Sequence, residues 1–419
     1  MTINDELTPV GHRKLHWQFA GLFGARIFGA VAQAGLFVML ARLAGPNDFG
    51  YVAAVLGVGA TVSAVADLGV GPFVSRLRAR DSDDPSITDG LRLNGRISTV
   101  LAVAFAVGLC VAGSLYDSRL FNTLPLAIWI ASEKNAETWL GIAVADGRTG
   151  LNIGSVLIRR GVALVLFGLV APVTDHIIVA FCATYAFANF LGAAWTRGKI
   201  RDSLPPAGKS KAMEILRSSW PFWINSVFLQ ARTLDVAIVA TFGSPAVAGI
   251  YAIPSRVTSP LRLLPTTFAT LVLPYASRGD EASLRSLRRG LAYVMGAMTA
   301  LLACLFASAG LLVRQTLGPA YEGAETPLRV LCVGLLFASV VSVMVSLLQG
   351  GGSERAVAAI SAGVTFVCLV GVGVGAVTSG ATGATVALSA SYVLHAALLA
   401  VLFASKRKYA TALVAGLEK

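Results

Sequence analysis

Charged residues are scarce in this chain of 419 residues. Asp, Glu, Lys and Arg together make up 13% of it, against the ~25% that is typical of soluble globular domains. Hydrophobic residues make up 55%, and the mean hydropathy is +0.72. This composition excludes an ordinary soluble enzyme or binding domain and indicates an integral membrane protein.

Cysteine is also rare, and the nucleotide-binding signatures are missing. The five cysteines stand singly inside apolar segments, at Cys110, Cys182, Cys304, Cys332 and Cys368. Because they lack metal-ligand spacing, the sequence predicts neither disulfides nor a zinc site, and we expect no cofactor. No GxxxxGK[ST] loop occurs, and GGGSER at Gly350 lacks the lysine that such a loop needs to bind ATP.

No cleavable signal peptide and no separate soluble domain are expected. The first ten residues are polar and acidic, and the apolar run that begins at His16, Trp17 and Gln18 is too long for a signal-peptide core. The longest polar stretches, 76–96 and 197–217, are too short to bury a core of their own. The first helix is therefore expected to act as its own insertion signal.

Apolar runs of bilayer length dominate the remaining sequence. A helix of ~20 apolar residues crosses a membrane, and the sequence contains twelve such candidates. They are 17–40, 50–74, 97–116, 121–144, 152–172, 176–196, 219–241, 247–275, 291–313, 328–349, 356–378 and 381–404. The predicted fold class is an all-α integral membrane protein with about twelve transmembrane helices.

The distribution of Lys and Arg predicts the orientation. If the N-terminus is cytoplasmic, 23 of the 34 Lys and Arg residues fall in cytoplasmic segments and four in outer segments. This is the positive-inside pattern, and it predicts that both termini are cytoplasmic. The net charge of +12 is then a topology signal, and nucleic acid is not an expected partner.

The chain looks duplicated. GPNDFGYVAA at 45–54 is echoed by GSPAVAGIYAI at 243–253, which places Gly50 opposite Gly249, and the basic, proline-containing SLPPAGKSK lies midway between them. Parallel repeats of this kind place a substrate path between the two halves of a transporter. The predicted organisation is a cytoplasmic segment 1–16, a six-helix bundle 17–196, a linker 197–218, a second bundle 219–404 and a cytoplasmic tail 405–419.

Four stretches carry a family resemblance. RLAGPNDFGYVAAV, ADLG at 66–69, LDVAIVATFGSPAVAGIYAIPSRV and LGPAYEGAETPLRVL resemble the polysaccharide biosynthesis branch of the multidrug/oligosaccharidyl-lipid/polysaccharide (MOP) flippase superfamily, in particular its Wzx-type flippases. The resemblance implies two six-helix bundles in a V around a central cavity, alternating access, and a place in the bacterial cytoplasmic (inner) membrane. It also implies a lipid-linked oligosaccharide as substrate, with a polysaccharide polymerase and glycosyltransferases as possible partners.

Arginines within the apolar runs are the candidate substrate-binding residues. Arginine stays protonated and its planar fork suits phosphate oxygens, so a lipid diphosphate would need such residues in its path. The candidates are Arg26, Arg232, Arg256 and Arg262, together with Gln33 and Asn225, which lie on the same helix faces as Arg26 and Arg232. Structural alternatives stay open: Arg26 could snorkel to the interface, Arg262 could serve a kink after Pro260, and Arg232 could pair with Asp235.

Carboxylates in the apolar runs are candidates for binding a coupling proton or sodium ion. They are Asp67, Asp235, Glu133 and Glu137, since ionisable groups at bilayer depth are a functional hypothesis by default. Glu133, Lys134 and Glu137 could instead form a self-compensating cluster on one helix. Arg159 and Arg160 are interpreted as snorkelling or headgroup-binding residues.

Three functions remain open on the sequence alone. The first is a flippase for polyprenyl-diphosphate-linked oligosaccharides, and the second is a multidrug or cation exporter of the same superfamily. The third, a membrane-embedded glycosyltransferase or ligase, would need a large outer loop with catalytic residues, and all predicted outer loops are short. A transporter that is not an enzyme is therefore expected.

Overall fold

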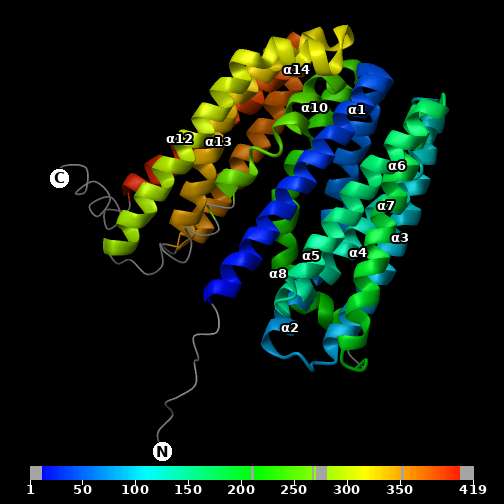
Figure 1. The fold of residues 1–419 in the computed structure, drawn as a ribbon, viewed down its shortest axis with the longest axis vertical. Helices are drawn as coiled ribbons and strands as arrows, with labels where there is room; N and C mark the ends of the chain where they lie inside the picture. Colours follow the sequence, from blue (N-terminus) through cyan, green and yellow to red (C-terminus); the bar gives the residue numbers. More distant parts are fainter. Residues whose placement is uncertain (1–11, 209–211, 267–268, 270–280, 351–352, 406–419) are drawn as a thin grey trace, which may run out of the picture. The chain divides into compact units, whose positions relative to one another are not determined.

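A computed structural model describes residues 12–208, 212–266, 269, 281–350 and 353–405 (Figure 1). All regular secondary structure in these ranges is helical, which confirms the predicted all-α class. Most of the predicted N-terminal segment 1–16, nearly all of the tail 405–419 and the last part of the predicted span 247–275 lie outside the described residues.

Most of the described helices are joined by short connections. The elements in chain order are α1 (His12–Asp67), α2 (Val70–Arg80), α3 (Ser86–Leu115), η1 (Ser118–Thr123), α4 (Leu126–Ala145), α5 (Thr149–Val156), η2 (Leu157–Val162), α6 (Ala163–Val170), η3 (Ala171–Val173), α7 (Ile177–Ile200), η4 (Arg201–Ser203), α8 (Ala212–Gln230), η5 (Ala231–Leu234), α9 (Asp235–Phe242), α10 (Pro245–Thr258), α12 (Glu281–Leu312), η6 (Val313–Leu317), η7 (Pro319–Ala324), α13 (Glu325–Gly350) and α14 (Glu354–Ser405).

Each predicted span has a helical counterpart, and glycines mark the turns between joined helices. The 56-residue α1 is interrupted at Gly45, whose φ of 77° suits a residue without a side chain, and α14 is interrupted at Ser379 and Gly380. Seven helical stretches in the described residues are long and apolar enough to cross a membrane, two of them about twice that length. These stretches amount to nine helices of spanning length, and the remaining predicted spans correspond to shorter or interrupted helices such as α8, α9 and α10, so the protein is a multi-pass membrane protein.

The chain forms two compact units. Unit 1 comprises Met1–Gln33, Val65–Thr174 and Ala180–Ile224, and unit 2 comprises Ala34–Ala64, Asp175–Val179 and Asn225–Lys419. The part of the first helical hairpin on either side of its turn at Gly45, residues 34–64, thus packs with the second half of the sequence. The chain passes from unit 2 back into unit 1 between Ala64 and Val65.

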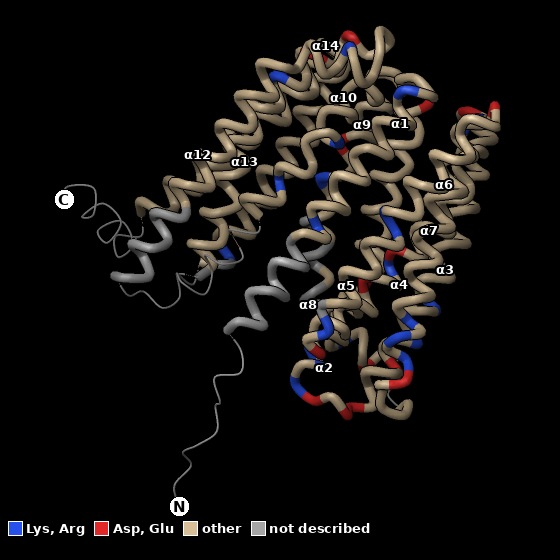
Figure 2. Tube along the Cα trace, viewed as in Figure 1, with Lys and Arg blue, Asp and Glu red and all other residues tan. Residues whose placement is uncertain are grey.

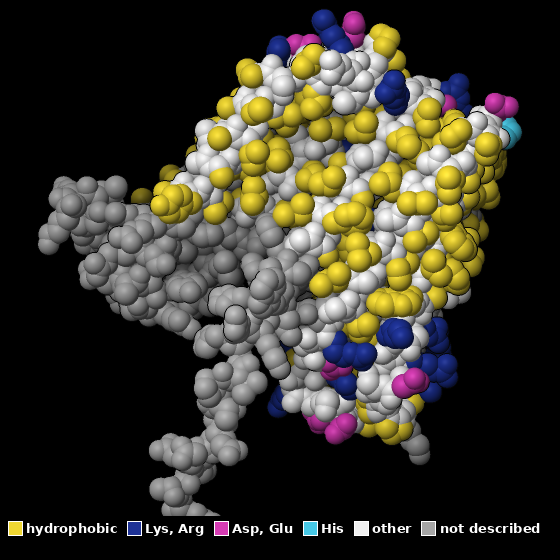
Figure 3. All heavy atoms as spheres, in the orientation of Figure 1, with side chains coloured by type: hydrophobic (Ala, Val, Ile, Leu, Met, Phe, Trp, Pro, Cys, Tyr) yellow, Lys and Arg dark blue, Asp and Glu magenta, His cyan; other side chains and the backbone are white. Residues whose placement is uncertain are grey.

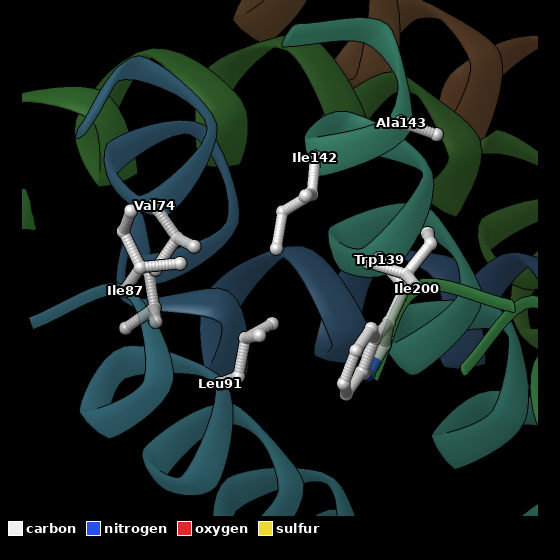
Figure 4. Close-up of a cluster of buried hydrophobic side chains, with 8 residues drawn as sticks. Val74, Ile87, Leu91, Trp139, Ile142, Ala143 and Ile200 are labelled. Carbon is white, nitrogen blue, oxygen red and sulfur yellow. The ribbon is translucent and has the colours of Figure 1, made fainter. Parts of the chain in front are cut away.

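A cluster of buried hydrophobic side chains holds one end of unit 1 together (Figure 4). It joins Val74 of α2, Ile87 and Leu91 of α3, Ile142 of α4 and Ile200 of α7, each 5% exposed or less. Charged residues gather along the chain at this end, near α2, whereas the helices beyond it carry few charged residues (Figure 2). The apolar cluster therefore packs the short α2 against three long helices.

The outward faces of the helices are apolar, as lipid contact requires. On α3, Val100, Val103, Val107 and Val111 recur at helical spacing and are 51–68% exposed. The visible face of the protein in Figure 3 shows hydrophobic side chains along the helices and charged ones toward their ends. In water such a surface would be an aggregation hazard, but in a bilayer it is the expected outer surface.

The two echoed sequence motifs pack directly against each other within unit 2. A Cβ added to Gly50 would overlap the carbonyl of Pro245, and one added to Gly249 would overlap the carbonyl of Pro46. Each motif places proline four residues before glycine, so the contact is reciprocal. Only glycine permits backbones to approach this closely. The internal repeat predicted from sequence therefore corresponds to a physical contact between the two copies.

Candidate functional site

A buried lysine organises the polar interior of unit 1. Lys134 of α4, 3% exposed, donates from Nζ to Oδ1 of Asp67 at 2.6 Å and to Oδ1 of Asn94 at 2.7 Å. Asn94 in turn donates to Oδ1 of Asn135 at 3.0 Å. Burying an ammonium group is costly unless it is paired and hydrogen-bonded, and Asp67 and Asn94 provide that compensation from two other helices.

A second buried ion-pair group lies on the same α4 helix. Oε1 of Glu133 is 3.2 Å from Nη1 of Arg159 and 3.0 Å from Nη2 of Arg160, and Arg160 also donates to the Tyr185 hydroxyl at 2.6 Å. Both arginines lie in η2, a π-helical turn. An extra residue in a helical turn, often found at functional sites, places two successive side chains toward one neighbour.

These contacts correct two sequence interpretations. Glu133 and Lys134 do not compensate each other along α4, since each pairs with a residue on a different helix. Arg159 and Arg160 do not snorkel, since their side chains are 8% and 15% exposed and paired with Glu133. Glu137 is exposed and has no hydrogen bond or ion pair among the described residues. It is therefore the unpaired carboxylate of this group.

Arg232 in unit 2 is held without a carboxylate partner among the described residues. Its Nη2 donates to Oγ of Ser391 at 3.0 Å, its guanidinium carbon lies 4.8 Å from the centre of the Tyr392 ring, and its buried Nε has no hydrogen-bond partner. Cation–π contact stabilises a guanidinium but leaves its charge unneutralised. The alternative in which Arg232 pairs with Asp235 is not realised, because Asp235 accepts instead from the Tyr251 hydroxyl at 2.8 Å.

The other candidate arginines have different surroundings. Arg256 of α10 lies over the Phe37 ring, 4.8 Å from its centre, and is partly buried. Arg262 is exposed and follows the end of α10 at Thr258, in a turn after Pro260. Arg232 and Arg256 both lie in unit 2. The structure thus gives both of them aromatic contacts, which sequence spacing does not reveal.

The candidate binding residues on α1 and α8 are Arg26, Gln33 and Asn225, and no hydrogen bond among the described residues fixes Arg26. Arg26 lies in unit 1, is exposed and makes no hydrogen bond or ion pair with another described residue, and Gln33 is partly buried. Asn225 lies on α8, but its side chain is outside the described residues. No group of three or more His, Cys, Asp or Glu residues that could hold a metal occurs in the described part of the chain.

Several polar residues around these groups escaped the sequence analysis. Lys134, Arg159 and Arg160 were noted there but not as partners of Asp67 and Glu133, and Ser391, Tyr392 and Tyr251 were not noted. The interior of unit 1 also contains buried polar atoms without a hydrogen-bond partner, namely Nε1 of Trp129, Oε2 of Glu133 and Oδ1 of Asn189. The sequence feature that could have identified such residues is a small polar side chain in an otherwise apolar helix.

Comparison with known proteins gives the fold. No protein-family model and no curated protein matches the chain. It is similar to the outward-facing structure of a multidrug resistance MATE family transporter of the MOP superfamily (15% identity, 94% of this chain and 96% of that one, TM-score 0.66). A MOP superfamily transporter from Pyrococcus furiosus, described as having a binding pocket of reversed polarity that suggests a different function, has the same identity and coverage and a TM-score of 0.63.

A third solved structure agrees over a similar length. The MATE transporter VcmN of Vibrio cholerae, in a mutant form, is 13% identical over 95% of this chain and 99% of that one, with a TM-score of 0.61. At such low identity the likeness establishes the fold alone. The chain therefore has the helical fold of MOP superfamily transporters.

Proposed function

We propose that this protein is a transporter, not an enzyme, that moves a polyprenyl-diphosphate-linked oligosaccharide from the cytoplasmic to the outer face of the membrane by alternating access. The observation that carries the proposal is Arg232. An arginine in an apolar segment that contacts a hydroxyl and an aromatic ring, but no carboxylate among the described residues, leaves a positive charge available for an anionic ligand. A diphosphate headgroup supplies that anion.

The remaining elements of the proposal follow from the same chemistry. Arg26 and Arg256, with Gln33, Asn225 and Arg262 as further candidates, would contact the headgroup or its sugars. A proton or sodium gradient would drive the cycle through one of the carboxylates, and the exposed Glu137 has no hydrogen-bond or ion-pair partner among the described residues. Polysaccharide polymerase and glycosyltransferases would act on the product and precursor at the bacterial inner membrane.

A multidrug or cation exporter is the second candidate. The similar solved structures include a multidrug resistance transporter, and an unpaired carboxylate such as Glu137 is the group that a cationic drug would contact. The two candidates make opposite demands on charge. An anionic lipid needs the arginines, whereas a cationic drug needs the carboxylate and is repelled by the arginines.

The sidedness of lipid-linked glycans tests the proposal. Cells lacking the gene are expected to accumulate the glycan on the cytoplasmic face, and the intact gene should reverse this. The Arg26→Ala, Arg232→Ala double variant should insert normally but fail to reverse it, because the headgroup loses its counter-charges. Arg314→Ala is the control for the loss of charge, since Arg314 is exposed like Arg26 but lies at the end of a helical stretch.

Two results would contradict the flippase proposal. Full complementation by the double variant would show that the arginines do not bind the headgroup. The exporter would be favoured if the deleted strain had normal glycan sidedness but increased sensitivity to cationic drugs. In that case the intact gene should restore drug resistance and Glu137→Gln should not.

A further inference from the structure

The helix that carries Arg232 changes its form at Arg232 itself. α8 ends at Gln230, the 3₁₀ turn η5 covers Ala231–Leu234, and α9 begins at Asp235. Successive side chains are about 120° apart in a 3₁₀ turn, so Arg232 and Thr233 point to different sides of the chain. A stretch of 3₁₀ helix inside a longer helix often marks a functional position.

Thr233 contacts the second part of α1 on one side of this turn. Its Oγ1 lies 2.9 Å from Oγ1 of Thr61, which is 9% exposed, and 2.8 Å from the carbonyl oxygen of Gln230. Each hydroxyl has one proton to donate. A chain in which Thr61 donates to Thr233 and Thr233 donates to Gln230 satisfies all three groups. A carbonyl where a transmembrane helix changes its form needs such an internal partner.

The backbone of α1 also lies against the turn. A Cβ added to Gly57 would overlap the carbonyl oxygen of Thr233, so glycine is required for this approach. The Gly57 carbonyl oxygen lies 3.1 Å from Oγ1 of Thr61 and 3.2 Å from Oγ1 of Thr233. All three residues belong to unit 2. The turn is therefore held from α1 by a close backbone contact and by two hydroxyl groups.

Arg232 extends from the same turn to α14, which also lies in unit 2. Its Nη2 donates to Oγ of Ser391 at 3.0 Å, and Ser391 donates its own proton to the Leu388 carbonyl at 2.6 Å. The guanidinium lies over the Tyr392 ring. An arginine side chain is long and flexible, so these contacts form reproducibly only if the backbone that carries Arg232 is fixed. A group that is already in place binds a ligand at a lower entropic cost.

We propose that Thr61 and Thr233 are positioning residues for Arg232. Their hydroxyl pair keeps η5 in its 3₁₀ form, and this form directs the guanidinium toward Ser391 and Tyr392. The buried Nε, which has no hydrogen-bond partner among the described residues, is then left for an anionic oxygen. The anionic ligand rests on the proposed function, whereas the positioning of Arg232 does not, because it is measured without a ligand.

Chemical modification of Arg232 tests the positioning directly. Phenylglyoxal modifies guanidinium groups, and mass spectrometry of the digested full-length protein would give the rate at Arg232. Thr61→Val and Thr233→Val keep a similar shape but lose the hydroxyl. Each is expected to raise the rate about fivefold, the factor that corresponds to one lost hydrogen bond. Thr61→Ser and Thr233→Ser keep the hydroxyl and should retain the slow rate.

Thr385→Val is the matched control. Thr385 is a buried threonine of unit 2, 2% exposed, and its hydroxyl donates to the Ala381 carbonyl of its own helix at 2.8 Å. The variant loses a comparable hydrogen bond, but it should leave the rate at Arg232 unchanged. An unchanged rate in both Thr61→Val and Thr233→Val would overturn the proposal, as would an equal rise in Thr385→Val.

Binding of undecaprenyl diphosphate to the purified protein separates this inference from the proposed function. Arg232→Gln should weaken binding strongly and Thr61→Val about fivefold, whereas Thr61→Ser should bind normally. Normal binding in Arg232→Gln would refute the headgroup role of Arg232 and leave the positioning to the modification rates. Weak binding in Arg232→Gln with normal binding in both Thr61→Val and Thr233→Val would overturn the inference, because Arg232 would then bind without being positioned.

Discussion

Alanine at Gly50 or Gly249 is expected to destabilise unit 2 strongly, although alanine is normally the better helix former. In each case the added methyl group would overlap a backbone carbonyl, that of Pro245 or of Pro46 respectively. A backbone cannot rotate away as a side chain can, so helices α1 and α10 must separate. Overpacking of this kind costs about 1–3 kcal/mol, and we expect the upper end of that range.

The thermal midpoint of the purified protein in detergent measures the effect. Gly35→Ala is the matched control, because Gly35 lies on the same α1 helix with no atom within 4 Å of an added Cβ. It should leave the midpoint unchanged or raise it slightly. Equal midpoints for Gly35→Ala, Gly50→Ala and Gly249→Ala would show that the two echoed motifs do not pack closely.

The double variant adds information about the repeat. Because Gly50 and Gly249 lie in one reciprocal contact, separating the helices once should relieve both overlaps. The combined loss in Gly50→Ala, Gly249→Ala is therefore expected to be smaller than the sum of the two single losses. Additive losses would mean that the two overlaps are accommodated independently.

The helices were predictable from sequence because their signals are local. Apolar runs of bilayer length, the distribution of Lys and Arg, and glycines at Gly45 and Gly380 all act within about twenty residues. The break between α1 and α2 at Leu68 was not predictable, since LGVG in an apolar run is compatible with an uninterrupted helix. It depends on Ser219 and Trp223, about 150 residues later, which donate to backbone carbonyls at and just before the break and which no local pattern specifies.

The candidate site was predictable in its residue types but not in its pairings. Spacing along one helix suggested Arg232 with Asp235 and Glu133 with Lys134, because residues three or four apart are neighbours. In the structure, all four have partners on other elements. A buried charge needs a partner with good hydrogen-bond geometry, and a residue close to it along the same helix does not always provide one. That geometry is set by how the helices pack. Sequence spacing therefore identified polar interiors without identifying their contacts.

Glu133→Ala is expected to be among the most damaging single changes in unit 1. It removes the carboxylate shared by Arg159 and Arg160, whose side chains are 8% and 15% exposed. Leaving one buried charge without its partner typically costs about 3–5 kcal/mol, and here two guanidinium groups lose theirs. We expect a low yield of monodisperse protein and a large fall in thermal midpoint. Glu133→Gln, which keeps one acceptor oxygen, should lose less.

Glu137→Gln is expected to affect transport without affecting stability. Glu137 lies one helical turn from Glu133, but it is exposed and lacks the ion pairs that Glu133 makes. Since Glu137 is exposed and unpaired among the described residues, its removal should change stability by less than about 0.5 kcal/mol. If Glu137 binds the coupling ion, transport in vesicles should persist but no longer respond to an imposed proton or sodium gradient. A stable variant with unchanged gradient dependence would remove Glu137 from the coupling candidates. A destabilisation equal to that of Glu133→Ala would instead mean that both carboxylates compensate the buried arginines.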